Sequence, residues 1–189
     1  DRKPASGGGE MSRLKTLSDN EVPQQSRALT EFIRSSLGWV PNFFRVCANS
    51  PAALSGFSFL DNALGQTLEY QLRTQIAVAV SQVNDAAYCL AGHTYYATRN
   101  LKLTQEEIAY NRAGASSDDR TNAAVFFACR VAEQRGHLKD EDLASVRRVG
   151  FSDGQIVEIV AVVASTCFTN FLNSVAETDV DYPVFGEIN

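Results

Sequence analysis

The chain has 189 residues, of which 44% are hydrophobic and 10% aromatic, and this is enough apolar material for one self-sufficient core. Its net charge is −5 and it has no cluster of lysine and arginine interleaved with aromatic residues, so composition argues against a nucleic-acid partner. The longest apolar run, residues 156–171, contains Glu158, Ser165 and Asn170 and is too polar for a bilayer span. We therefore expect a cytoplasmic protein that contacts neither nucleic acid nor membrane.

Residues 1–10 contain three consecutive glycines and lack the charged-then-apolar order of a secretory signal. They precede Met11, the only methionine. We expect this segment to be a disordered tail or vector-derived sequence, and residues 11–189 to form a single domain.

Signals for helix starts recur along the chain, whereas alternating strand patterns and Asn-Gly or Asp-Gly hairpin turns do not. Ser50 followed by Pro51 matches an N-cap with proline at the first helical position. Capping boxes are expected for two pairs, Thr104 with Glu107 and Ser152 with Gln155. The patterns predict an all-α fold with helices near residues 24–37, 51–64, 68–83, 104–112, 120–135, 140–148 and 152–175.

The four cysteines are spaced about forty residues apart, at Cys47, Cys89, Cys129 and Cys167. This spacing fits neither a metal-ligand cluster nor the disulfide framework of a small secreted domain. We expect reduced thiols, with no metal and no cofactor. Apolar neighbours predict that all but Cys89 are small core residues.

Residues 84–93 read Asn-Asp-Ala-Ala-Tyr-Cys-Leu-Ala-Gly-His and place a cysteine four residues before a histidine. On a helix these positions share a face, so Cys89 and His93 can meet and the imidazole can favour the thiolate. The alternative is a buried thiol beside a structural histidine. His137, which follows a helix-ending glycine, is expected to be structural.

A longer pattern surrounds this pair: Arg73, Thr74 and Ile76 open an apolar helix, and Asn84, Ala86, Tyr88, Cys89 and His93 follow it. The pattern resembles the carboxymuconolactone decarboxylase superfamily, and within it the AhpD-like, peroxidase-related proteins. Their signature is Arg-Glu-x-Ile, an apolar helix, then Asn-x-Cys-x-Tyr-Cys-x-x-x-His. The likeness covers nearly all of residues 28–185. It implies an all-helical AhpD-like domain and a homo-oligomer.

The peroxidase mechanism implied by that signature is a relay of glutamate, cysteine pair and histidine. By resemblance, Cys89 takes the peroxide-attacking position and His93 the proton-relay position. Thr74 replaces the glutamate and Ala86 the resolving cysteine. A threonine hydroxyl does not titrate where a carboxylate would, and alanine forms no disulfide, so dithiol peroxidase activity should be weak or absent. Glu69 is expected in a solvated first helical turn rather than in this relay.

Aromatic side chains are expected to line an apolar pocket next to Cys89, which would suit a hydrophobic organic ligand. The candidates are Trp39, Phe43, Phe44, Phe57, Phe59 and Tyr88, with Asn84, Asn170 and Asn173 as polar groups in or near the pocket.

The leading hypothesis is a peroxidase-related protein with an altered site. Cys89 is its residual redox residue and His93 its proton partner, and a peroxide or small organic metabolite is reduced with the help of an external thiol. One alternative is a non-redox lyase or isomerase that uses His93 as acid or base. The other is a non-catalytic binding protein on the same scaffold.

Overall fold

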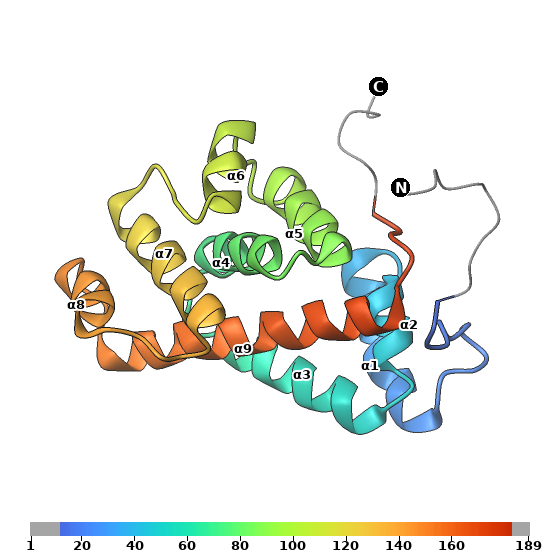
Figure 1. Cartoon of the computed structure of the whole chain (residues 1–189). Coiled ribbons are helices and arrows are strands. Elements are labelled where there is room, and N and C mark those ends of the chain that lie inside the picture. The colour runs from blue at the N-terminus through green and yellow to red at the C-terminus, as the bar shows by residue number, and fades with distance from the viewer. Residues whose placement is uncertain (1–11, 183–189) are drawn as a thin grey trace, which may run out of the picture.

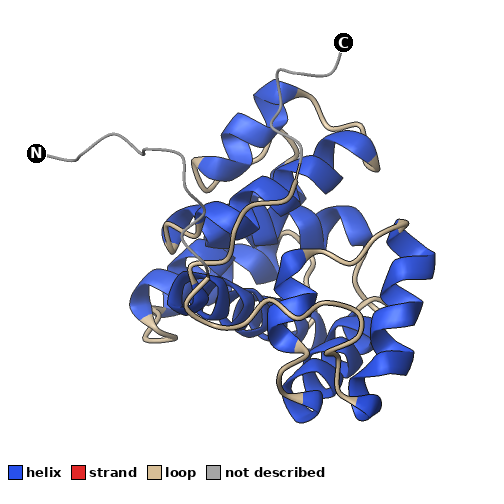
Figure 2. Ribbon diagram, turned by 90° about the vertical axis from the view of Figure 1, so that its right-hand side faces the viewer, coloured by secondary structure: helices blue, strands red, loops and turns tan. Residues whose placement is uncertain are grey.

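The computed structural model describes residues 12–182, which form nine α-helices and no strand (Figure 2). The all-α prediction is confirmed. The helices are α1 Gln24–Leu37, α2 Asn42–Cys47, α3 Pro51–Leu64, α4 Tyr70–Val83, α5 Ala87–Arg99, α6 Gln105–Arg112, α7 Asp119–Gln134, α8 Asp140–Arg148 and α9 Asp153–Ala176. Seven of them match the predicted ranges closely. No range was predicted for the short helix α2 or for α5, although Cys89 and His93 were expected to share a helical face. The predicted tail, residues 1–10, lies outside the described residues.

Helix α4 is the centre of the fold, and it contacts α5, α6, α7 and α9 (Figure 1). Its residues from Thr74 to Ser81 are all buried, including Ala77 and Ala79, whose small side chains allow neighbouring helices to approach. A helix that is apolar on nearly every side requires cover on every side. The surrounding helices provide it.

Two hydrophobic clusters meet at α4 and α5. The larger joins α4, α7 and α9 through fully buried side chains such as Ile76, Phe127 and Ile159, each of which contributes about 1.5–3 kcal/mol on burial. The smaller joins α1, α2 and the start of α5, and it contains Phe43, Cys89 and Tyr182. Cys89 therefore belongs to the core rather than to the surface.

The predicted caps are largely confirmed. The Ser50 side chain accepts a hydrogen bond from the Ala53 amide, and Ser152 with Gln155 forms both hydrogen bonds of a capping box. At α6 only half of the predicted box forms, since Thr104 accepts from the Glu107 amide. The Glu107 carboxylate instead accepts hydrogen bonds from the side chains of Gln75, Asn111, Ser116 and Ser117. It thereby ties α4 and α6 to the loop before α7.

By length and composition, α9 is the one helix within residues 12–182 that could cross a membrane. In the fold it packs along α3, α4, α5 and α7, and 44% of its most apolar window is buried. The rest of that window is not buried, and Val157, Phe171 and Val175 of α9 are exposed among the described residues.

Candidate active site

The turn between α4 and α5 places Cys89 in the first helical turn of α5. Asp85 adopts a left-handed conformation with φ of 50°, which aspartate tolerates better than most residues. The Ala86 amide then donates to the Ser81 carbonyl at 2.9 Å. Cys89 follows as the third residue of the helix, with its side chain facing α9.

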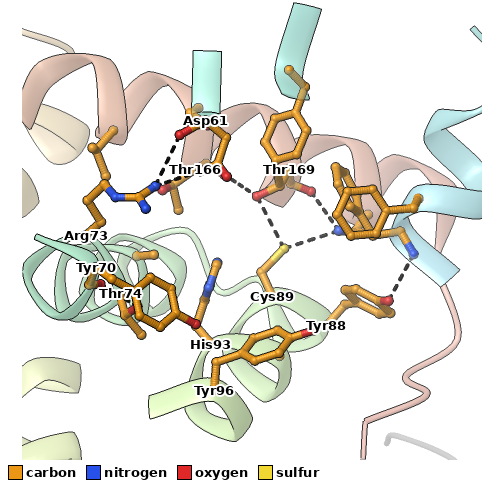
Figure 3. Close-up of a pocket in the computed structure, with 18 of the residues that line it drawn as sticks. Asp61, Tyr70, Arg73, Thr74, Tyr88, Cys89, His93, Tyr96, Thr166 and Thr169 are labelled. Carbon is orange, nitrogen blue, oxygen red and sulfur yellow. Dashed lines mark hydrogen bonds and ion pairs between the residues drawn. The ribbon is translucent and has the colours of Figure 1, made fainter. Parts of the chain in front are cut away.

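A cavity of about 290 Å³ lies next to Cys89, bounded by α2, α3, α4, α5, α9 and the segment after α9 (Figure 3). Aromatic rings form much of its wall. Phe43 packs edge-on against Phe44 and Phe57, with ring centroids 4.9 and 5.2 Å apart. The other lining residues used below are Asp61, Tyr70, Arg73, Thr74, Tyr88, Cys89, His93, Tyr96, Thr169, Asn173 and Tyr182.

The structure brings most of the predicted pocket residues together and leaves five of them outside. Cys89, His93, Tyr88, Thr74, Phe43, Phe44, Phe57 and Asn173 line the cavity. Trp39, Asn84, Ala86 and Asn170 do not, although Ala86 is buried in the cluster that contains Cys89. Phe59 was also expected at the pocket, but its side chain is 78% exposed to solvent.

The Cys89 thiol is held by two residues of α9 and is only 5% exposed. The Asn173 amide donates to Cys89 Sγ at 3.2 Å. The thiol donates to Thr169 Oγ1 at 3.7 Å, and that hydroxyl donates in turn to the Thr166 carbonyl. Burial raises the pKa of Cys89, while the hydrogen bonds from α9 oppose the increase. The resting group is therefore a neutral thiol.

His93 lines the same cavity one helical turn after Cys89. Although its ring borders the cavity, burial lowers the pKa of His93 to about 4, so the imidazole is neutral at physiological pH. No hydrogen bond joins the two side chains within residues 12–182. Cys89 and His93 share a helical face, as the sequence predicts. The expectation that the imidazole favours a thiolate on Cys89 is wrong, because burial disfavours the charged form of both groups.

At position 74 the structure offers no proton carrier. Thr74 Oγ1 donates to the carbonyl of Tyr70, one turn earlier on α4, at 2.8 Å. Its hydroxyl hydrogen is thus committed to the backbone of its own helix. Glu69 is exposed just before α4 and does not line the cavity, as its expected place in a solvated first turn implies.

Behind Cys89, asparagine side chains connect the end of α4 to α9. The Asn84 amide donates to Asn170 Oδ1 at 2.8 Å and approaches Cys167 Sγ at 3.4 Å. Asn170 donates to Ser81 Oγ at 3.0 Å. These contacts hold α9 against the turn that precedes Cys89. Asn84 and Asn170 therefore have a structural role outside the cavity.

The segment after α9 closes one end of the cavity. Tyr88 donates to Asp181 Oδ1 at 2.9 Å, and its hydroxyl oxygen accepts from the Phe43 amide at 2.9 Å. Burial raises the pKa of Tyr88 far above its ordinary value, so the phenol stays protonated. Tyr182 packs on Gly92, where an added Cβ would lie 2.8 Å from the ring. Glycine at position 92 is what admits this tyrosine.

Sequence reasoning missed the charged pair at the cavity. Arg73 Nη1 lies 3.0 Å from Asp61 Oδ1, joining α4 to α3 (Figure 3). Arg73 was noted only as part of a family pattern, and nothing along the chain indicates that α3 brings a carboxylate to it. Among residues 12–182, no group of three or more His, Cys, Asp and Glu side chains is arranged to hold a metal ion.

Comparison with known families identifies the segment that carries the site. Residues 49–134 match the carboxymuconolactone decarboxylase family. They run from the start of α3 to the end of α7 and include Arg73, Thr74, Cys89 and His93. No curated protein has a matching sequence.

Solved structures share the fold over most of the chain. The AhpD-core structure of a peroxidase-related protein from Ralstonia eutropha JMP134 is 24% identical, with a TM-score of 0.80 over 92% of this chain and 94% of that one. A peroxidase-related protein from Silicibacter sp. TM1040 is 24% identical, with a TM-score of 0.77 over 93% and 95% of the two chains. A cysteine-to-alanine variant of the debrominase Bmp8, in complex with 2,3,4-tribromopyrrole, is 21% identical, with a TM-score of 0.75 over 94% of each chain. At these identities the similarity shows the fold.

The lowered pKa of His93 predicts a specific loss of stability in acid. Unfolded His93 binds a proton below about pH 6.5, whereas the folded protein resists protonation until about pH 4. Its contribution is therefore present above pH 6.5 and is lost as the pH falls through this window. Relative to His93→Gln, the wild type should lose roughly 1–3 kcal/mol between pH 7 and pH 4, as measured by urea denaturation. His137→Gln, at an exposed site, should keep the wild-type pH dependence, and parallel curves for the wild type and His93→Gln would contradict the assignment.

Proposed function

The chain belongs to the carboxymuconolactone decarboxylase superfamily and has an AhpD-like fold, and from this premise we propose that it is a single-cysteine redox enzyme. Cys89 is its nucleophile and His93 the base that receives the thiol proton. The substrate is a small, partly apolar molecule that enters the aromatic cavity. An external thiol restores the enzyme after each turnover.

The observation that carries this proposal is the placement of Cys89 and His93 on one wall of the same cavity. A thiol becomes a strong nucleophile only as it loses its proton. With its pKa lowered to about 4, the imidazole of His93 is unprotonated throughout the physiological range, but it is a weaker base than an ordinary histidine and takes the proton only as the sulfur forms its new bond. Proton transfer then accompanies attack, and no standing thiolate is required.

With an organic hydroperoxide, Cys89 Sγ attacks the terminal oxygen while its proton passes to His93. The O–O bond breaks and His93 returns the proton to the departing alkoxide, leaving a sulfenic acid on Cys89 and an alcohol. A first external thiol condenses with the sulfenic acid, releases water and forms a mixed disulfide. A second thiol releases Cys89 as a thiol, together with the disulfide of the two reductant molecules.

The residues around Cys89 support its reduction by an external thiol rather than by a second cysteine of the chain. Ala86 supplies no second sulfur, and the other three cysteines do not line the cavity. Burial raises the pKa of both Cys47 and Cys129 to about 11, so neither provides a ready thiolate. Thr74 supplies no carboxylate for a proton relay. The two losses support a single-cysteine cycle over a dithiol one.

The aromatic wall supports an organic substrate in preference to hydrogen peroxide alone. Phe43, Phe44 and Phe57 form contiguous apolar surface facing the site, and rings of this kind hold planar or apolar ligands. The debrominase with the same fold was crystallised with a small brominated heteroaromatic ring. Halogenated aromatic compounds therefore belong in the substrate panel beside organic hydroperoxides.

A second candidate uses the same residues without redox chemistry. The neutral imidazole of His93 can remove a proton from a carbon acid by itself, with Cys89 only a wall of the cavity. This is a lyase or isomerase, and the observation that favours it is the neutral imidazole in the lining of the cavity. A binding protein without activity would require neither side chain.

Two substitutions separate these functions. In an assay of hydroperoxide consumption with excess thiol, Cys89→Ser should lose nearly all turnover, and His93→Gln should lose about a hundredfold because no base takes the proton. Cys167→Ser is the matched control, since that thiol lies outside the cavity and should leave the rate unchanged. Full activity in Cys89→Ser would exclude the single-cysteine cycle. Loss in His93→Gln alone, on a substrate with an acidic C–H bond, would select the lyase or isomerase.

Restoring the missing groups tests whether the cavity keeps the geometry of the dithiol relay. The double variant Ala86→Cys with Thr74→Glu supplies a resolving thiol and a carboxylate, and it should raise peroxide turnover with a dithiol reductant by about tenfold or more. The control is Ala86→Ser with Thr74→Gln, which has similar volumes and neither function. If the two double variants react equally, the surrounding cavity no longer fits that mechanism.

A further inference from the structure

Two polar atoms at the cavity have no hydrogen-bond partner among the described residues. They are Arg73 Nε and Asn173 Oδ1, and each atom is shielded from solvent. Buried polar atoms without partners are uncommon in folded proteins, because each loses its hydrogen bonds to water without replacement. Four other such atoms among the described residues, on Gln75, Thr98, Asn111 and Thr178, lie away from the cavity, whereas these two can take a partner from a ligand that fills it.

Arg73 is the only lysine or arginine among the residues that line the cavity. Its side chain is 16% exposed, and its Nη1 atom is occupied by the side chain and carbonyl of Asp61. The Nε atom lies on the opposite edge, beside Nη2, and Nη2 makes no hydrogen bond within residues 12–182. This Nε–Nη2 edge carries two parallel N–H groups, the geometry that binds a carboxylate with both of its oxygens.

The charge around the cavity favours one class of ligand. Asp61 is the only carboxylate of the lining, and its side chain is 57% exposed, so its pairing with Arg73 is weak enough to yield. The chain has a net charge of −5, which leaves Arg73 as the one fixed cation that faces the cavity. An anionic group entering the cavity has a single place to bind.

At the side of Cys89, Asn173 offers the complementary group. Asn173 is 4% exposed, and its Nδ2 atom donates to both the Thr169 carbonyl and Cys89 Sγ. Its Oδ1 atom is left as an acceptor without a donor. A ligand with an O–H or N–H group near Cys89 would satisfy it.

We propose that the cavity binds an aromatic carboxylate that carries a hydrogen-bond donor on its ring. The carboxylate pairs with the Nε–Nη2 edge of Arg73, the ring lies against the aromatic wall, and the donor faces Asn173. Figure 3 shows Arg73 and Asp61 at one end of the cavity and Tyr88 at the other, with His93 and Cys89 between them. A ligand that is bound at Arg73 and extends along the cavity therefore lies next to Cys89 and His93. The inference rests on the proposed function in taking this cavity as the site of reaction.

Calorimetric titration of the Cys89→Ala protein measures binding without turnover. The probes are 4-hydroxybenzoate and its neutral counterpart 4-hydroxybenzamide. The carboxylate should bind about tenfold more tightly or better. Arg73→Gln should remove that preference and leave amide binding within about twofold. Arg112→Gln, an exposed arginine that contacts Gln82 away from the cavity, should change neither.

Asp61→Asn provides a second test that does not depend on the stability of the Arg73 variant. It removes the carboxylate that competes for the guanidinium, so the preference for the benzoate should increase by about threefold or more. Equal affinity for the two probes, binding of neither, or an unchanged preference in Asp61→Asn would overturn the proposal. Since heat is recorded in a protein without Cys89, failure of the thiol chemistry leaves this result intact. If the preference for the carboxylate is absent, the result of the Cys89→Ser turnover assay is likewise unaffected.

Discussion

Burial of Cys89 between α5 and α9, with His93 partly buried beside it, is the constraint on which the chemistry of this protein depends. A thiol and an imidazole four residues apart would form an ion pair in an open, electropositive site. Here the same burial raises the pKa of Cys89 and lowers that of His93. Both groups rest uncharged, and together they are a nucleophile and a base that act when a substrate arrives.

The fold maintains this burial from three sides. Helix α4 requires cover on every face and thereby draws α5 and α9 against it. Asn173 and Thr169 of α9 then hold the sulfur directly. The segment after α9 adds Tyr182, which closes the cavity against Gly92. A more open arrangement would restore water to the pair and return both pKa values toward their ordinary positions.

Much of the fold and part of the site could be predicted from sequence, because both depend on local rules. Caps such as Ser50 and Ser152 mark helix starts, and spacing alone places Cys89 and His93 on one face. The rest depends on contacts between distant segments. Asp61 meets Arg73, and Tyr182 meets Gly92, only after the helices pack. The shift of each pKa follows from that packing and has no local signature.

The ionisation of Cys89 tests this account most directly. The difference in ultraviolet thiolate absorbance between the wild type and Cys89→Ser, followed against pH, reports the titration of that sulfur alone. The account predicts a midpoint above the ordinary cysteine value of about 8.5. A midpoint below about 7 would show a standing thiolate paired with a charged imidazole and would contradict the neutral pair.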